Sequence, residues 1–394
     1  MSSYGFIGRI IRRMHGITRA VLLTALAGLL TNARTSKAQT LPANAEPDSG
    51  SVVCAPGVYP NAQTDCLPLG PSIYLTRLAG LGLTLPPAPL PGSRADPSLA
   101  ELPFRYFHVI SQDPVAVGSA PGASGGQSLY PGFVYIGYVD RLDTGHGIYY
   151  LMENGGWIPG KGERVGEIPA FQGMQFQRTP KNSFGWTFED IPVRSAPGYA
   201  AQQAGLDLPP FSVIQIYETQ NLDGADWNLI GLDQWVEARK VAQVVINTQP
   251  PDGSNNAARW IDVNLAEQTL AVYDAGRLVF AAMIASGVEP FWTRPGLFQI
   301  TQKKAAETMR NNDPSDFYYL EDVPWTMYFD GPRALHGAYW RTRFGYPQSH
   351  GCVNLSVGDA HWLFNWAQQG DWVYINDPTG QTPTDRSLYT AGAY

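Results

Sequence analysis

The stretch that decides the fold reads HGAYWRTRFGYPQSHGCVN and covers residues 336–354. In its last five residues, 350–354, the polar or reactive side chains of His350, Cys352 and Asn354 alternate with Gly351 and Val353. In an extended chain alternate side chains point to the same side, so His350, Cys352 and Asn354 would share one face while Val353 turns to the core. Gly351 has no side chain, which lets another group approach the backbone beside the thiol. The pattern therefore predicts a thiol presented between polar side chains.

A cysteine placed in this way is a candidate nucleophile. The thiolate is the reactive form and a free thiol has a pKa of about 8.5, so a base is needed. A histidine within reach, such as His336, can take the proton and return it to a leaving amine. The backbone N–H groups of Gly351 and Cys352 could hold the oxyanion of a tetrahedral intermediate. An imidazolium beside the sulfur would lower the thiol pKa and keep the thiol reactive at neutral pH or below.

Two other interpretations of the cysteine stay open at this point. A metal could bind His336, His350, Cys352 and His361, but H-x-C is a tight spacing for two zinc ligands, and no CxxC or HxxxH accompanies it. A lone cysteine can also be buried and inert. We expect neither a metal nor a cofactor.

One helix is predicted directly after this stretch. Ser356 and Asp359 have the spacing of a capping box, and Gly370 is placed to end the helix. An apolar stripe follows the helical period through Ala360, Leu363, Phe364 and Ala367. His361 falls on the opposite face and is expected to be a solvated surface residue. Short strands are predicted at 261–263, 270–273, 278–284 and 371–376.

The region 256–377 resembles the L,D-transpeptidase (YkuD-type) catalytic domain. The resemblance rests on His336-Gly337 followed by Ser349-His350-Gly351-Cys352-Val353-Asn354, which looks like the signature of that family. The segment 263–273 resembles the family's opening hairpin, and 293–300 (TRPGLFQI) resembles its "TPxG-x-F-x-I" segment.

The resemblance implies a mostly β catalytic domain that acts on peptidoglycan stem tetrapeptides. It implies an acyl-thioester on Cys352, release of the terminal D-alanine and a 3→3 cross-link. His336 would be the general base, oriented by the Gly337 carbonyl, while Ser349, His350, Gly351 and Asn354 would line the site. Arg341 and Arg343 of the loop 338–348 could pair with a substrate carboxylate, although an ordinary surface loop fits equally well. The same residues would serve an L,D-carboxypeptidase, and an inactive domain of a wall-binding protein is a further alternative.

An internal repeat precedes the catalytic region. GSAPG at 118–122 recurs as RSAPG at 194–198, and GWI at 156–158 recurs as QWV at 234–236. Each unit, 104–170 and 171–245, holds about five short strands with tight turns, which is typical of a small β-barrel. The closing segment 227–236 resembles the bacterial SH3-like modules of cell-wall proteins, although core packing explains each tryptophan as well. The expected fold is mainly β, with two SH3-like barrels followed by the catalytic domain and its one capped helix.

The N-terminus has the form of an export signal. Residues 1–38 combine six basic residues, no acidic one, an eleven-residue apolar core at 20–30 and a small-x-small site at 36–38. We expect them to be removed, which leaves no membrane span and places the chain in the cell wall or periplasm. A linker rich in proline, glycine and alanine is expected at 39–103, with a short packed element at 73–83. Cys54 and Cys66 are disulfide candidates, and 378–394 is expected to be a flexible tail.

Charge limits the partners. The residues after 38 have a net charge of −13, which disfavours binding to a phosphate backbone, so no nucleic acid is expected. The sequence does not determine the oligomeric state.

Overall fold

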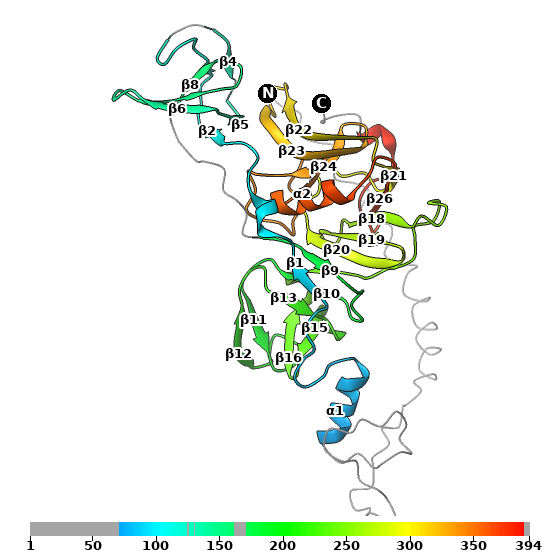
Figure 1. The fold of residues 1–394 in the computed structure, drawn as a ribbon. Coiled ribbons are helices and arrows are strands. Elements are labelled where there is room, and N and C mark those ends of the chain that lie inside the picture. Colours follow the sequence, from blue (N-terminus) through cyan, green and yellow to red (C-terminus); the bar gives the residue numbers. More distant parts are fainter. Residues whose placement is uncertain (1–70, 124–125, 130, 161–170, 390–394) are drawn as a thin grey trace, which may run out of the picture. The chain divides into compact units, whose positions relative to one another are not determined.

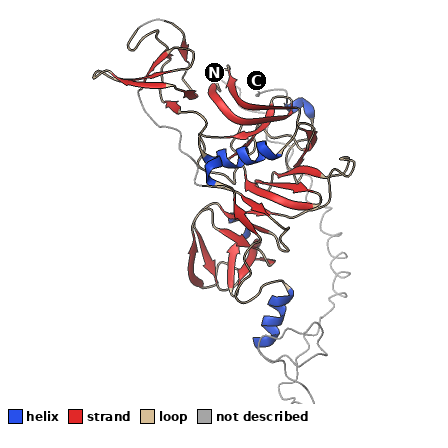
Figure 2. Ribbon diagram, in the orientation of Figure 1, coloured by secondary structure: helices blue, strands red, loops and turns tan. Residues whose placement is uncertain are grey.

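The computed structural model describes residues 71–123, 126–129, 131–160 and 171–389, which are mostly β structure with two α-helices (Figures 1 and 2). All the described residues belong to one compact unit, which begins at Gly70. The expected signal segment and the two disulfide candidates, Cys54 and Cys66, lie outside the described residues. No helix of the described part is long and apolar enough to cross a membrane.

The first large sheet of the C-terminal region has seven strands in the order β1-β9-β20-β19-β18-β26-β21. In that order they span Gly92–Arg94, Met174–Phe176, Arg277–Met283, Thr269–Asp274, Arg259–Asn264, Trp372–Asn376 and Gly296–Gln299. The strands predicted at 261–263, 270–273, 278–284 and 371–376 all lie here. Ala275 and Gly276 join β19 to β20 with φ of 49° and 71°, as a two-residue hairpin turn with both central residues left-handed requires.

The second large sheet holds the sequence motif. Its path is β2-β5-β23-β24-β25, and β22 pairs with β23 outside that path. The strands span Tyr106–Val109, Phe133–Gly137, Tyr318–Asp330, Arg333–Gly337 and Val353–Leu355, with β22 at Gln302–Asn311. β24 and β25 run parallel, with Leu335 opposite Val353 and His336 opposite Asn354. The two halves of the motif, 336–337 and 349–354, are thus brought together by strand pairing.

Helix α2, Val357–Trp366, follows the motif as predicted. Ser356 is its N-cap, and its Oγ accepts a hydrogen bond from the Asp359 amide at 3.2 Å. Ala360, Leu363 and Ala367 are buried in a core shared with both large sheets. The predicted C-terminal glycine was placed wrongly, because the helix ends at Trp366 with Ala367 as its C-cap. Gly370 instead takes φ of +94° in the following turn.

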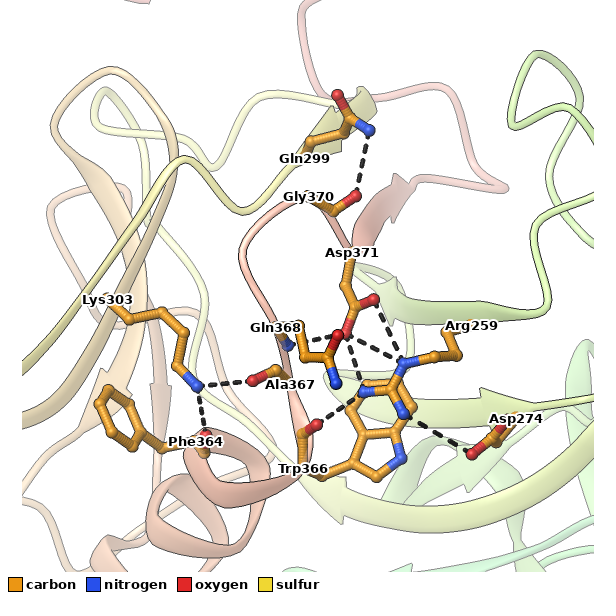
Figure 3. A network of polar contacts seen from close by, with 10 residues as sticks. All are labelled: Arg259, Asp274, Gln299, Lys303, Phe364, Trp366, Ala367, Gln368, Gly370 and Asp371. Carbon is orange, nitrogen blue, oxygen red and sulfur yellow. Dashed lines mark hydrogen bonds and ion pairs between the residues drawn. The ribbon is translucent and has the colours of Figure 1, made fainter.

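Two cations satisfy the last carbonyls of α2, as Figure 3 shows. Lys303 Nζ donates to the carbonyls of Phe364 and Ala367, each at 2.5 Å. Arg259 Nη2 donates to the Trp366 carbonyl at 2.6 Å and to Asp371 at 3.0 Å. A helix C-terminus carries unpaired carbonyls and partial negative charge, so these cations replace the glycine cap expected from the sequence.

His361 is not the solvated residue that the helical pattern predicted. It is half-buried, and its ring stacks on Trp325 with centroids 3.9 Å apart. Its Nδ1 lies 3.3 Å from the Leu99 carbonyl. The face of α2 opposite the apolar stripe is therefore covered by β23 and by the 3₁₀ helix η1, Pro97–Ala100.

The segment expected as a linker contributes structure in its second half. Helix α1, Pro71–Gly80, covers most of the packed element expected at 73–83 and is a second helix besides the one predicted. Tyr74 Oη donates to Asp233, and Arg77 pairs with Glu218. β1 is an edge strand of the first large sheet. The proline-rich composition of this segment predicted a linker. Helix α1 and strand β1 were not predicted because the residues that they contact are distant in the sequence.

The internal repeat is visible in the strand registers, at a constant offset of 78. β2 pairs with β5 with Tyr106 opposite Gly137, and the second unit pairs Phe184 with Gln215. The strands of the first unit are completed by β3, β4, β6, β7 and β8, at Val115–Ala116, Ser128–Leu129, Asp140–Asp143, Ile148–Leu151 and Trp157–Pro159. The second unit has β10 to β17, at Phe184–Thr187, Ile191–Arg194, Gln203–Leu208, Val213–Gln215, Glu218–Leu222, Ala225–Gly231, Gln234–Glu237 and Val241–Val244, with the 3₁₀ helix η2 at Ala238–Lys240. Their likeness to SH3-like modules stays a prediction.

The repeat units share strands with the catalytic region. β5 pairs in parallel with β23, with Phe133 opposite Tyr318, and β9 pairs with β20. The tail is also ordered further than expected, because the 3₁₀ helix η3, Arg386–Tyr389, ends on a buried Tyr389. The carbonyl of Tyr389 accepts a hydrogen bond from Arg333 at 3.0 Å. Strand pairing therefore crosses the predicted boundaries at 103 and 245, and a hydrogen bond crosses the one at 378.

Candidate active site

The parallel pairing of β24 with β25 sets the face on which Cys352 lies. One step before the Leu335–Val353 pair, the ladder would place Ala334 opposite Cys352. Side chains alternate along each strand, so Cys352 and Asn354 share the face of Ala334 and His336. The Sγ atom lies 3.9 Å from the Pro332 carbonyl oxygen, and Cys352 is half-buried. The thiol and His336 thus lie on one face, two residues apart along the ladder.

A chain of hydrogen bonds determines the tautomer of His336. Arg341 Nε can act only as a hydrogen-bond donor, and it donates to Asn354 Oδ1 at 2.5 Å. The Nδ2 of Asn354 must therefore face His336 Nε2, 3.0 Å away. The other ring nitrogen, Nδ1, then carries the proton and donates to the Gly337 carbonyl at 3.1 Å. The buried imidazole is held with the lone pair of Nε2 on the side of Asn354.

The two loop arginines have different surroundings. Besides Asn354, Arg341 donates to the side chain of Gln348 at 2.9 Å and to its carbonyl at 2.7 Å. Each guanidinium nitrogen therefore donates to a protein group, which gives Arg341 a positioning role, while its pairing with a substrate carboxylate stays a prediction. Arg343 is exposed. Its pairing with a substrate carboxylate, predicted from the sequence, stays a prediction.

Burial shifts the two central groups away from an ion pair. It lowers the pKa of His336 to about 4, with the charge of Arg341 acting in the same direction and the Gly337 carbonyl opposing it. It raises the pKa of the Cys352 thiol, against the opposing effects of the Ala334 amide and the Arg333 charge. Both groups are neutral at pH 7. The expectation of a preformed imidazolium that lowers the thiol pKa is therefore wrong, because burial penalises both charged forms.

The turn before the thiol is held from two sides. Ser349 Oγ donates to the Cys352 carbonyl at 2.5 Å and accepts from the Gly351 amide at 3.1 Å. Thr293 Oγ1, which is buried, donates to the Gly351 carbonyl at 2.9 Å. Gly351 has φ of +111°, and a Cβ there would lie 3.1 Å from Arg333 Nε, so glycine is required on both counts. Of the two predicted oxyanion donors, Gly351 already has a partner for its amide.

The tip of the β22–β23 hairpin closes over His350. Its Nε2 lies 3.1 Å from Asp316 Oδ1, and its ring lies 5.0 Å from that of Tyr318. Proximity to Cys352 also adds to the rise of the pKa of Tyr318, which burial dominates. Sequence reasoning missed Asp316, Tyr318 and Thr293. The segment 293–300 had drawn attention to Thr293 without giving it a role, and no pattern indicated that Asp316 and Tyr318 would lie beside His350.

The described residues hold no group of three or more histidine, cysteine, aspartate or glutamate side chains that could bind a metal ion. His361, a member of the alternative metal set, contacts Trp325 and Leu99. His350 and His336 contact different partners, Asp316 and Asn354. The arrangement instead suits acyl transfer, with a thiol, a neutral imidazole as base and a pinned backbone turn.

Comparison with known proteins agrees with this site. Residues 258–375 match the family model of YkuD, the L,D-transpeptidase catalytic domain. The chain therefore carries a YkuD-type L,D-transpeptidase catalytic domain. A Bacillus subtilis (strain 168) protein named "Putative L,D-transpeptidase YciB" is 21% identical over 159 residues, which cover 32% of this chain and 73% of that protein.

Two solved structures show the same kind of likeness. The L,D-transpeptidase of Stackebrandtia nassauensis is 25% identical, with a TM-score of 0.27, and the match covers 33% of this chain and 58% of that one. The catalytic domain of the E. faecium L,D-transpeptidase is 24% identical, with a TM-score of 0.28, over 30% of this chain and 96% of that one.

Proposed function

We propose that this protein is an exported peptidoglycan L,D-transpeptidase that joins stem peptides by 3→3 cross-links through a thioester on Cys352. The observation that carries the proposal is the hydrogen-bond chain from Arg341 through Asn354 to His336, which leaves a neutral imidazole beside the thiol. The base is oriented through its other ring nitrogen, Nδ1, as it is by the carboxylate of a protease triad. The Gly337 carbonyl takes the place of that carboxylate.

The first half-reaction forms the acyl-enzyme. The Sγ of Cys352 attacks the carbonyl between the third stem residue and the terminal D-alanine, while His336 Nε2 takes the thiol proton. This step requires the Asn354 amide to yield the lone pair that it now occupies. The C–N bond then breaks, the proton passes to the leaving amine, and D-alanine departs. The Cys352 amide is the oxyanion donor in this proposal, since the Gly351 amide bonds to Ser349.

The second half-reaction transfers the acyl group. The side-chain amine on the third residue of another stem attacks the thioester carbonyl and loses a proton to His336. The C–S bond breaks and the thiol is restored. Because both reacting groups start neutral, no charge has to be buried before substrate arrives. Water as the acceptor would give tripeptide instead, so the shielded site must favour the amine.

The test is mass spectrometry of muropeptides after the chain from residue 39 onward is incubated with sacculi that carry tetrapeptides. We expect dimers joined 3→3, and none with Cys352→Ala. Tripeptides without dimers would mean an L,D-carboxypeptidase, and unchanged sacculi would favour a wall-binding protein with an inactive domain. Export is tested separately: N-terminal sequencing of protein recovered outside the cytoplasm should begin after residue 38, and a chain that begins at Met1 would contradict removal of the signal.

A further inference from the structure

We propose that aromatic side chains of the first repeat unit, together with one from the catalytic loop 338–348, bind the glycan strand that carries the donor stem peptide. This inference rests on the proposed function and adds a substrate contact to it. The rings are His108 on β2, Phe133 and Tyr135 on β5, and Trp340 in the loop after β24. We call this set the aromatic platform.

Strand pairing connects the platform to the catalytic site. β5 continues the catalytic sheet, with Phe133 opposite Tyr318 and Tyr135 opposite Leu320. Paired residues of neighbouring parallel strands point to the same face, so Phe133 lies on the face of Tyr318, whose ring is 5.0 Å from His350. Trp340 closes the connection, since its ring lies 5.8 Å from His336 and 6.4 Å from Phe133.

The rings form a continuous surface that is open to solvent at one residue. His108 stacks on Tyr135 with centroids 4.2 Å apart and planes at 2°. Phe133 meets Tyr135 edge-on at 5.2 Å, and its side chain is 42% exposed. Exposed aromatic faces that are already fixed by neighbouring rings lose little entropy on binding. A pyranose ring has an apolar face of C–H groups that matches such a surface.

The distance from the thiol fits a sugar rather than the stem itself. The reacting carbonyl is three residues from the point where the stem joins the sugar, which is at most about 10–11 Å of extended chain. The Trp340 ring lies 5.8 Å from that of His336 and 6.4 Å from that of Phe133, so the Phe133 ring is at most about 12 Å from the His336 ring. A stem that runs from Cys352 along this face would reach the platform with its glycan end.

The second repeat unit shows that the platform is not a general feature of the repeat. At the offset of 78, His108, Phe133 and Tyr135 correspond to Trp186, Phe211 and Val213. Trp186 is buried, at 1% exposure, in the core beneath that unit. The exposed ring beside the catalytic face, Phe133, thus belongs to the unit whose strand joins the catalytic sheet.

The test compares two donors that differ only in the sugar: a disaccharide-tetrapeptide and the free tetrapeptide of the same sequence. Phe133→Leu keeps an apolar side chain but removes the aromatic face. We expect it to raise KM for the disaccharide-tetrapeptide about three- to tenfold and to leave KM for the free tetrapeptide unchanged. Leu206→Ala, at a side chain that is also 42% exposed, should leave both KM values unchanged.

Several results would overturn the inference. Equal changes for both donors would mean that Phe133 contacts the peptide or supports the fold, and no change for either would mean that it contacts neither. A parent dimer that Phe133→Leu dissociates, seen by sedimentation, would make the platform a self-interface. Calorimetric binding of the disaccharide-tetrapeptide to Cys352→Ala, with and without Phe133→Leu, checks the platform without turnover. Binding that depends on Phe133 supports it even if the parent proves inactive, whereas binding that does not depend on Phe133 refutes it.

Discussion

The neutral state of the thiol and its base has a direct consequence for alkylation of Cys352 by iodoacetamide. A free thiol has a pKa of about 8.5, and burial raises the pKa of Cys352 above its ordinary value. At pH 7 at most about 3% of the sulfur would then be thiolate, so the alkylation rate should be at most about one-thirtieth of its high-pH plateau. A preformed ion pair with His336 would instead give a rate near the plateau already at pH 7.

The variant His336→Gln separates the two possibilities. His336 has a pKa of about 4 and is neutral above about pH 5, so its removal should leave the alkylation profile between pH 6 and 10 unchanged. Turnover should nevertheless fall about 10²–10⁴-fold, because the base and the acid for the leaving amine are both lost. His350→Gln, whose ring faces Asp316, is the matched control and should keep more activity. A parent profile already flat at pH 7, and shifted upward by His336→Gln, would refute this reasoning.

Three further predictions test the residues around the site. Arg341→Lys should lower kcat about tenfold or more and change its pH profile, because lysine cannot bind Asn354 and Gln348 at the same time. Arg343→Lys, at an exposed side chain, should change kcat little. A larger loss of kcat in Arg343→Lys than in Arg341→Lys would contradict the positioning role of Arg341. In urea unfolding, Lys303→Met should lower the free energy of unfolding by about 1–3 kcal/mol. Lys304→Met, whose ion pair with Glu307 is partly exposed, should lower it by about 0.5 kcal/mol or less. Equal losses in the two variants would mean that Lys303 does not cap the helix. Burial raises the pKa of Asp359 to about 7, above its unfolded value, so the free energy of unfolding falls as pH rises from about 4 to 7. In thermal unfolding, Asp359→Asn should therefore gain up to about 4 kcal/mol of stability relative to the parent over that range. A stability difference between the two proteins that does not vary with pH would contradict this.

Local patterns predicted a large part of the catalytic region. The alternation of His350, Cys352 and Asn354 and the capping-box spacing of Ser356 and Asp359 each depend on neighbours within a few residues. The hairpin turn at 275–276 and the repeat before the domain are of the same kind, since each repeats or ends a short-range pattern. These features could be read from the sequence because backbone geometry ties them to residue order.

What lies between distant segments required the tertiary structure. The sequence placed His336 and Asn354 in one motif, but the strand register and Arg341 determine which nitrogen of the imidazole carries the proton. Burial reversed the expected direction of the thiol pKa, because desolvation depends on atoms from many parts of the chain. The pairing of β5 with β23 joins residues 185 positions apart, Phe133 and Tyr318, and no local pattern encodes such a partner. The sequence by itself therefore determined which groups could react, whereas long-range packing determined their protonation and the surface that surrounds them.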